Sequence, residues 1–147
     1  MSHNVVIDNV KIKSVDALRM AVKELKEEGA NVTLNEDRKT FRTWRGQRNE
    51  CDMVIELPTQ QFDVGLVKQP DGSYAPVFDH MLDMNREIAC PYDPRDANGN
   101  RDRATIGKLM QRYATCATEL EMAMAGHSCT RAKGKNGEIE ILVDYAA

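Results

Sequence analysis

The chain has 147 residues, of which 41% are hydrophobic and 29% are charged, and its formal net charge is −3. This length and composition predict one soluble domain, residues 1–147, with enough apolar side chains to form a core. The small negative charge excludes a general binder of polyanions, so any attraction to nucleic acid must come from a local cationic cluster.

The first residues and the cysteines together predict a cytoplasmic protein. Met1–Asn4 leads directly into a strand-like segment without a secretory leader, and no apolar run is long enough to span a bilayer. Cys51, Cys90, Cys116 and Cys129 form no CxxC pair, which is typical of reduced thiols in a cytoplasmic protein.

The first part of the chain predicts a strand and then a helix. Apolar residues alternate with polar ones over Val5–Lys13, as expected of a strand. Ser14 or Asp16 is placed to cap the following helix, and Gly29 is placed to end it. The apolar face of that helix consists of Leu18, Ala21, Val22 and Leu25.

The middle of the chain predicts an antiparallel meander. Alternating apolar residues mark strands at Val32–Leu34, Met53–Leu57, Phe62–Leu66 and Tyr74–Phe78. Asn35–Lys39 has the polar composition of a turn, and we expect Thr40–Trp44 to return from it beside the preceding strand. Pro70-Asp71-Gly72-Ser73 favours a tight turn before the last strand of the meander.

The last part predicts an exposed excursion, a second long helix and a hairpin. Pro91, Pro94 and Asn98-Gly99-Asn100 interrupt the pattern within residues 81–103. The apolar stripe of the second helix consists of Ile106, Leu109, Tyr113, Cys116, Leu120 and Met124. We expect Tyr113 to lie in the core with its hydroxyl at the sheet edge. The closing hairpin consists of Cys129–Lys133, the turn Lys135-Asn136-Gly137-Glu138, and Ile139–Tyr145.

This order of elements predicts an α+β fold. We expect a two-layer sandwich in which two long helices cover one face of a mainly antiparallel sheet, as a variant of the ferredoxin-like arrangement. Exposed edge strands near residues 40–44 or 139–145 would also allow a homodimer to form by strand pairing.

Short motifs in a fixed order extend over nearly the whole chain. They are Met1-Ser2-His3, Asp16-Ala17-Leu18, Trp44-Arg45-Gly46-Gln47, Asp52-Met53-Val54-Ile55, Phe62-Asp63-Val64-Gly65, Asp71-Gly72-Ser73-Tyr74, Gln111-Arg112-Tyr113-Ala114 and Gly137 with Ile139-Glu140-Ile141. In these motifs the chain resembles the hypothetical chloroplast open reading frame 35 family, small uncharacterised proteins of plastids, cyanobacteria, other bacteria and some phages. The resemblance implies an accessory protein, with an AAA-type ATPase as its partner, and it brings no catalytic residues. Residues 81–103 depart from the family's pattern.

The segment Arg38–Arg48 concentrates cations around two aromatic residues in an otherwise acidic protein. Guanidinium groups pair with phosphates or carboxylates, and an aromatic ring can stack on a base. The candidate binding residues are Arg38, Arg42, Trp44, Arg45, Gln47 and Arg48, joined by Arg101, Arg103 and Arg112 if the second helix begins beside the hairpin. The structural alternative is a hairpin whose aromatic rings pack into the core and whose arginines face water or pair with Glu36, Asp37 and Glu50.

The sequence offers little for metal or covalent chemistry. His127 and Cys129 share one side of a strand, but the closely paired ligands typical of zinc sites are missing even with His80, Cys51 or Cys90 added. There is no GxSxG, HExxH, P-loop or GxGxxG motif. Asp79-His80 together with Cys90 could form a catalytic thiol–imidazole pair, but these residues are separated by an irregular segment. We expect no cofactor, and we expect Cys116 to be a core residue.

These observations favour a non-catalytic interaction or regulatory protein. It would bind a protein partner through the basic aromatic hairpin and the 81–103 excursion. The alternative is a nucleotide-binding or nucleic-acid-binding protein that uses the same arginines together with Trp44.

Overall fold

The computed structural model describes residues 4–6, 11–43, 46–79, 106–133 and 139–145. The elements are β1 (Asn4–Val6), α1 (Val15–Glu27), β2 (Thr33–Asn35), β3 (Thr40–Arg42), β4 (Arg48–Glu50), β5 (Met53–Glu56), β6 (Val64–Lys68), β7 (Tyr74–Asp79), α2 (Gly107–Met124), β8 (Ser128–Lys133) and β9 (Ile139–Asp144). The predicted excursion at 81–103 and the predicted turn at 135–138 lie outside the described residues. No helix in the described part of the chain is both long enough and apolar enough to cross a membrane.

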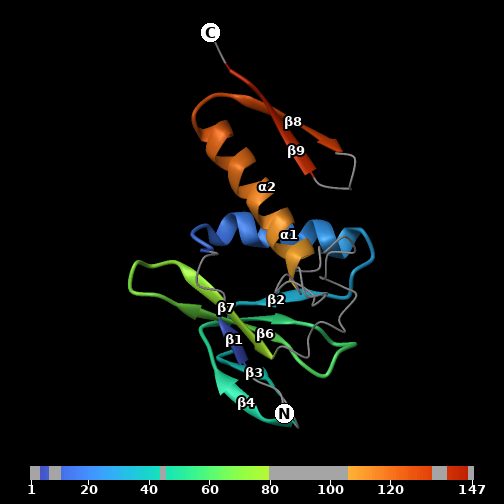
Figure 1. Ribbon diagram of the computed structural model, residues 1–147, viewed down its shortest axis with the longest axis vertical. Coiled ribbons are helices and arrows are strands. Elements are labelled where there is room, and N and C mark those ends of the chain that lie inside the picture. The colour runs from blue at the N-terminus through green and yellow to red at the C-terminus, as the bar shows by residue number, and fades with distance from the viewer. Residues whose placement is uncertain (1–3, 7–10, 44–45, 80–105, 134–138, 146–147) are drawn as a thin grey trace, which may run out of the picture.

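A five-stranded sheet forms the base of the molecule (Figure 1). Its order is β1-β7-β6-β5-β2, and every neighbouring pair is antiparallel. The predicted meander corresponds to β5, β6 and β7, and the predicted α+β class is confirmed. The predicted first strand over Val5–Lys13 is described only at its two ends. Its start lies in β1, Ile12 near its end makes a bridge to Tyr74, and residues 7–10 lie outside the described residues.

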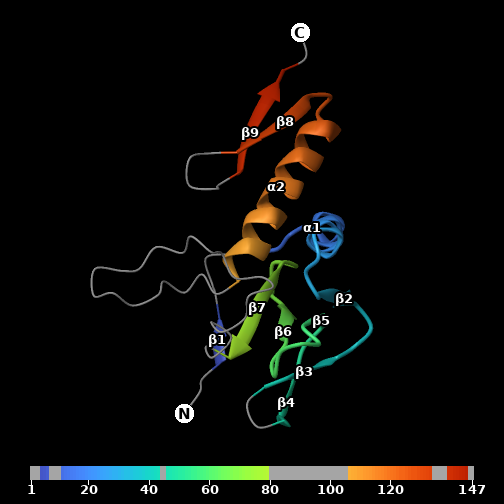
Figure 2. The same cartoon turned by 90° about the vertical axis from the view of Figure 1, so that its right-hand side faces the viewer.

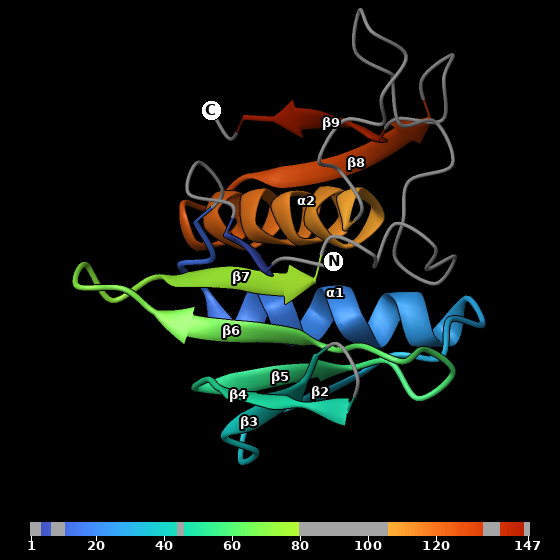
Figure 3. The ribbon, with the colours of Figure 1, turned by 60° about the horizontal axis from the view of Figure 1, so that its bottom comes forward.

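Helix α1 covers one face of this sheet (Figure 3). The side chain of Ser14 caps it by accepting a hydrogen bond from the backbone N–H of Ala17 at 3.1 Å, an interaction of about 1 kcal/mol. Its buried residues are Ala17, Leu18, Ala21, Val22 and Leu25, which recur at helical spacing. They pack on the apolar side chains that alternate strand residues direct to this face, among them Ile55 and Leu66.

The opposite face of the sheet is partly covered by a separate two-stranded sheet formed by β3 and β4. Phe41 of β3 is buried against Cys51 and Val54. Met53 and Ile55, which flank Val54 in β5, belong instead to the core that α1 covers. The expectation that residues 40–44 pair with the strand before them is therefore wrong. Strand β2 pairs with β5, and the turn at 35–39 carries the chain over to the second face, where the Phe41 ring is buried.

Helix α2 crosses α1 on the side away from the sheet and then extends beyond it (Figure 2). The first part of its predicted stripe is buried, and Tyr113 belongs to the main core. The Tyr113 hydroxyl accepts hydrogen bonds from the backbone N–H groups of Lys13 at 2.8 Å and Ser14 at 3.1 Å, so it holds the start of α1 rather than the sheet edge. The end of the stripe is not buried as expected, since Met124 is 83% exposed.

The last two strands form a hairpin that joins neither of the other sheets. Strands β8 and β9 pair over six residues, from Ser128 with Asp144 to Lys133 with Ile139, as predicted. The hairpin packs along the far half of α2, so sheet, α1, and α2 with its hairpin follow one another along the long axis of the molecule (Figures 1 and 2).

We expect Gly65→Ala to destabilise the protein by about 1–3 kcal/mol, the usual range for overpacking a core. A Cβ at position 65 would lie 2.4 Å from Cδ1 of the Phe41 ring, so the ring would have to move off the sheet. Urea denaturation measures the loss. In a Phe41→Leu background the same glycine substitution should cost less, and an equal cost in both backgrounds would contradict the proposed contact.

Candidate functional site

The candidate site is the β3–β4 hairpin, which is fixed at its base and open at its outer strand. Thr40 pairs with Glu50, and the backbone N–H of Cys51 donates to the Lys39 carbonyl at 2.9 Å. Near the tip, the Thr43 N–H donates to the Gln47 carbonyl at 2.7 Å. Among the described strands, β4 pairs with β3 alone, and all three of its residues are exposed.

A buried ion pair fixes β3 to the main sheet. Asp63 is 1% exposed, and its carboxylate accepts hydrogen bonds from Arg42 Nη2 at 2.8 Å and Arg42 Nε at 3.0 Å. The backbone N–H groups of Leu57 and Arg42 also donate to it, at 3.1 and 3.2 Å. Arg42 Nη2 in turn donates to the Leu57 carbonyl at 2.9 Å, so every group buried here has a partner.

Burial by itself would raise the pKa of Asp63, but the hydrogen bonds from Arg42 and from the two backbone amides outweigh it and lower that pKa. The carboxylate is therefore charged at neutral pH and forms a permanent pair with Arg42. Asp63 is not among the binding residues predicted from the sequence, although an acidic residue between the apolar Phe62 and Val64 is a signal of a buried, partnered carboxylate.

The predicted binding residues fall into three groups. Arg38 and Arg42 are half-buried and already paired, Arg38 with Glu56 and Arg42 with Asp63, each at 2.8 Å. Gln47 and Arg48 are exposed on the hairpin. Trp44, Arg45, Arg101 and Arg103 lie outside the described residues. The structural alternative predicted that these arginines pair with carboxylates, and Arg38 and Arg42 do so. The acidic partners differ from the predicted ones, because they are Glu56 and Asp63.

Arg112 lies apart from the hairpin, on the other side of the sheet. It pairs with Glu24 at 3.2 Å and with Glu28, both on α1. Arg112 was predicted to join the hairpin residues only if the second helix began beside the hairpin. Helix α2 packs on α1 instead, so Arg112 is not part of the candidate site.

Glu24 is the centre of a second charged cluster, where α1, α2 and β8 meet. Arg131 of β8 donates to Glu24 at 2.6 and 3.0 Å and to Glu119 at 2.8 and 2.6 Å. The Cys116 thiol donates to Glu24 Oε2 at 3.3 Å, and Arg131 approaches its sulfur at 3.7 Å. These contacts lower the pKa of Glu24, with Arg131 as the main cause. We term this cluster the Glu24 junction.

The Glu24 junction is suited to holding elements together rather than to chemistry. Cys116 is fully buried, as predicted, and burial together with its hydrogen bond to Glu24 raises the pKa of its thiol to about 11. A thiol with such a pKa is protonated at neutral pH and is a poor nucleophile. Burial likewise raises the pKa of Cys51.

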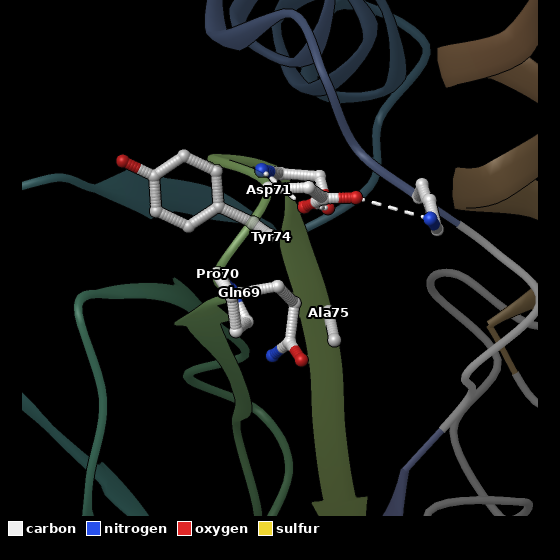
Figure 4. A pocket seen from close by; sticks show the side chains of 7 residues that line it. Gln69, Pro70, Asp71, Tyr74 and Ala75 are labelled. Carbon is white, nitrogen blue, oxygen red and sulfur yellow. Dashed lines mark hydrogen bonds and ion pairs between the residues drawn. The ribbon is translucent and has the colours of Figure 1, made fainter.

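A shallow pocket of about 280 Å³ lies at the turn between β6 and β7 (Figure 4). Its charged groups are already paired, since Lys11 Nζ lies 3.0 Å from Asp71 and Asp71 also accepts hydrogen bonds from the Ser73 hydroxyl and N–H. These contacts shape the turn and engage both charged side chains that line the pocket.

Metal ligands do not gather in the described residues, where no group of three or more His, Cys, Asp or Glu side chains could hold an ion. His127 packs edge-to-face on Tyr145 at 4.9 Å between ring centroids, while Cys51 lies at the base of the β3–β4 hairpin. His80 and Cys90 lie outside the described residues.

Comparison with known proteins gives no match to a family model, to a curated protein or to a solved structure. The resemblance to the chloroplast open reading frame 35 family therefore stays a prediction from its motifs.

We expect Asp63→Asn to lower the free energy of unfolding by about 2–4 kcal/mol at pH 7, since it leaves Arg42 without its counter-charge. Because the folded-state pKa of Asp63 is lowered, this stabilisation is present above the unfolded-state pKa of about 3.9 and is lost as the pH falls below it. The difference between wild type and variant, measured by urea denaturation at pH 7 and pH 3, should therefore shrink in acid.

The control is Glu36→Gln, which breaks the exposed ion pair with Arg19 and should cost less than about 1 kcal/mol. A difference between wild type and Asp63→Asn that is the same at both pH values would contradict the assigned charge of Asp63.

We expect Arg131→Gln to loosen the β8–β9 hairpin without unfolding the sheet. The substitution removes the ion pairs with Glu24 and Glu119 that join the hairpin to both helices. Hydrogen exchange followed by mass spectrometry should show amides of β8 and β9 exchanging about tenfold faster, with β5, β6 and β7 unchanged. Arg19→Gln, which removes an exposed pair on α1, is the control, and equal acceleration in both variants would contradict the role of the Glu24 junction.

Proposed function

We propose that this protein is a non-catalytic interaction protein that binds a protein partner through its β3–β4 hairpin. The observation that carries the proposal is the contrast between the two strands of that hairpin. Strand β3 is fixed by the buried Phe41 ring and the Arg42–Asp63 pair, while β4 exposes all three of its residues and one whole edge. Because β4 is paired to the anchored β3, its outer edge is held in place and can pair with an extended segment of another protein at little entropic cost.

Charge and position favour Arg48 as the residue that selects this partner. It is exposed on β4 directly opposite Arg42, whose charge is already compensated by Asp63. An acidic segment laid along β4 would therefore meet a guanidinium group that no described residue pairs with, and carboxylates bind such a group bidentately. By the family resemblance, an AAA-type ATPase is the first partner to test.

The nucleic-acid alternative has less support. Two of the arginines on which it depends, Arg38 and Arg42, are committed to Glu56 and Asp63. Fewer free cations mean fewer phosphate contacts, and phosphate contacts supply most of the affinity for nucleic acid.

The proposal predicts that Arg48→Glu loses specific partners in a quantitative pull-down from nuclease-treated lysate. We expect recovery of those partners to fall about tenfold, as for the loss of one interface residue worth about 1.4 kcal/mol. The matched control is Lys23→Glu, which makes the same charge change at an exposed position of α1, across the sheet from the hairpin.

The same proteins recovered at equal levels by all three baits would contradict the proposal. Partners that disappear after nuclease treatment of the wild-type sample would instead favour the nucleic-acid alternative.

A further inference from the structure

The hydrogen bonds of the β3–β4 hairpin show which backbone groups face its outer edge. The ladder bonds at its two ends join Lys39 with Cys51 and Thr43 with Gln47. Bonded and non-bonded pairs alternate in an antiparallel ladder, so Phe41 with Asn49 is the bonded pair between them. Arg48 and Glu50 belong to the non-bonded pairs and therefore direct their backbone N–H and C=O groups away from β3.

The outer edge of β3 is already occupied at Arg42. Its backbone N–H donates to the Asp63 carboxylate at 3.2 Å, and its carbonyl accepts a hydrogen bond from the Asp63 N–H at 3.1 Å. The edge of β4 is open by contrast, since β4 pairs with β3 alone among the described strands. Figures 1 and 2 show β4 at the end of the molecule opposite to the β8–β9 hairpin.

This open edge presents two opposite charges. Arg48 and Glu50 are two residues apart in an extended strand, so their side chains project on the same face. Both are exposed, and neither has an ion pair or a side-chain hydrogen bond with another described residue. Strand β4 buries none of its residues, and a ribbon of two strands is only marginally stable, so an added strand would stabilise it.

We propose that β4 pairs with β4 of a second copy of this chain, antiparallel and about a two-fold axis at Asn49. Arg48 of each chain then faces Glu50 of the partner subunit. Because both residues direct their backbone groups outward, each facing pair exchanges two backbone hydrogen bonds. Each pair also brings a guanidinium group to a carboxylate, and the two hairpins become one four-stranded sheet.

The backbone and the charges together select this axis. An axis between two residues would place outward-facing backbone groups opposite groups that already bond to β3. An axis at Arg48 would oppose two guanidinium groups, and an axis at Glu50 would oppose two carboxylates, both of which destabilise a sheet. A parallel pair in register would oppose the same like charges. Of these arrangements, the antiparallel pair about Asn49 is the one that brings unlike charges together.

The strand cannot be lengthened to favour another register. Gly46 has a φ of +73°, so the chain leaves the extended conformation two residues before Arg48. At the other end, the Asp52 N–H donates to the Leu66 carbonyl at 2.8 Å, which engages Asp52 with β6 of the main sheet. Pairing between copies is therefore confined to the three residues of β4.

Charged side chains on an edge strand often prevent pairing, because charges of one sign repel a second copy. Arg48 and Glu50 act differently, since they have opposite signs and lie on either side of the axis. The strand that complements Arg-Asn-Glu in antiparallel pairing reads Arg-x-Glu, which is β4 itself. A second copy therefore supplies both charges that this edge lacks, without a residue from any other protein.

Pairing between copies would also regulate the candidate site, because it occupies the edge to which the partner is proposed to bind. This regulatory role rests on the proposed function, whereas the pairing itself does not. Contacts as small as one three-residue strand give weak complexes, so we expect a dimer that dissociates on dilution. A partner with more contacts can then displace the second copy.

Sedimentation velocity of the whole chain over a concentration series tests for the pair, and charge reversal tests its register. We expect the wild type to move toward twice the monomer mass as its concentration rises. Arg48→Glu places a second carboxylate opposite Glu50 of the partner subunit, and Glu50→Arg places a second guanidinium group opposite Arg48 of the partner subunit. Each should raise the dissociation constant of the dimer about tenfold or more.

The matched control is the double variant Arg48→Glu, Glu50→Arg, which has the net charge of the wild type. It exchanges the two charges and so again places unlike charges face to face, and it should dimerise as the wild type does. An equal mixture of the two single variants should form a heterodimer, because one chain then offers two carboxylates and the other two guanidinium groups.

Asn49→Cys tests the position of the axis. A residue on the axis faces itself in a non-bonded pair, with Cα atoms about 4.5 Å apart, which is close enough for a disulfide. In a Cys90→Ser, Cys129→Ser background, mild oxidation should therefore join two chains through position 49. Lys23→Cys, at an exposed position of α1, is the control for random collision.

A wild type that sediments as a monomer at all concentrations would overturn the inference. So would a double variant that stays monomeric, or a chain with Asn49→Cys that cross-links no faster than the one with Lys23→Cys. Circular dichroism that matches the wild type establishes that each variant is folded. A monomeric result would leave the proposed partner binding standing, since the pull-down does not depend on pairing between copies.

Discussion

The buried carboxylate of Asp63 is the interaction on which the arrangement of this protein depends. It lies just before β6 and receives four hydrogen bonds, two from the Arg42 side chain and two from backbone amides. A charge this deeply buried is tolerable only when fully paired, and here the pairing joins β3 to the main sheet. The hairpin that carries the candidate site therefore has a fixed position on the second face of the sheet.

Apolar contact with the sheet, which lies between α1 and the β3–β4 hairpin, also holds the hairpin in position. Successive residues of β5 and β6 point to opposite faces, so Ile55 faces α1 while Val54 faces Phe41. Gly65 completes the second face, because only a residue without a side chain leaves room for the Phe41 ring. Both faces of the meander thus contribute to burial, and the hairpin is held by apolar contact as well as by charge.

The other end of the molecule is organised by the Glu24 junction. There Arg112 and Arg131 converge on carboxylates of α1 and α2, and Cys116 adds a hydrogen bond from a protonated thiol. The junction joins β8 to both helices, while Met124 at the end of α2 is exposed. Two separate surfaces result. One is the hairpin edge that exposes Arg48, and the other is the β8–β9 hairpin with the end of α2, where Met124, Leu142 and Tyr145 are exposed.

The sequence by itself determined the local elements. Ser14 and the spacing of Leu18, Ala21, Val22 and Leu25 define α1, and alternation of apolar residues defines β5, β6 and β7, because both signals arise between neighbours in the chain. The burial of Cys116 follows from its place on the α2 stripe.

Tertiary structure alone decided which faces and charges meet. Alternation in Thr40–Arg42 is compatible with pairing beside β2 or with crossing to the second face, and the burial of Phe41 over Gly65 selected the second. The partners of Arg38 and Arg42 lie 18 and 21 residues away, beyond any local signal. The α2 stripe shows the same limit, because periodicity marks an apolar face but only packing determines that α1 covers its first half and leaves Met124 exposed.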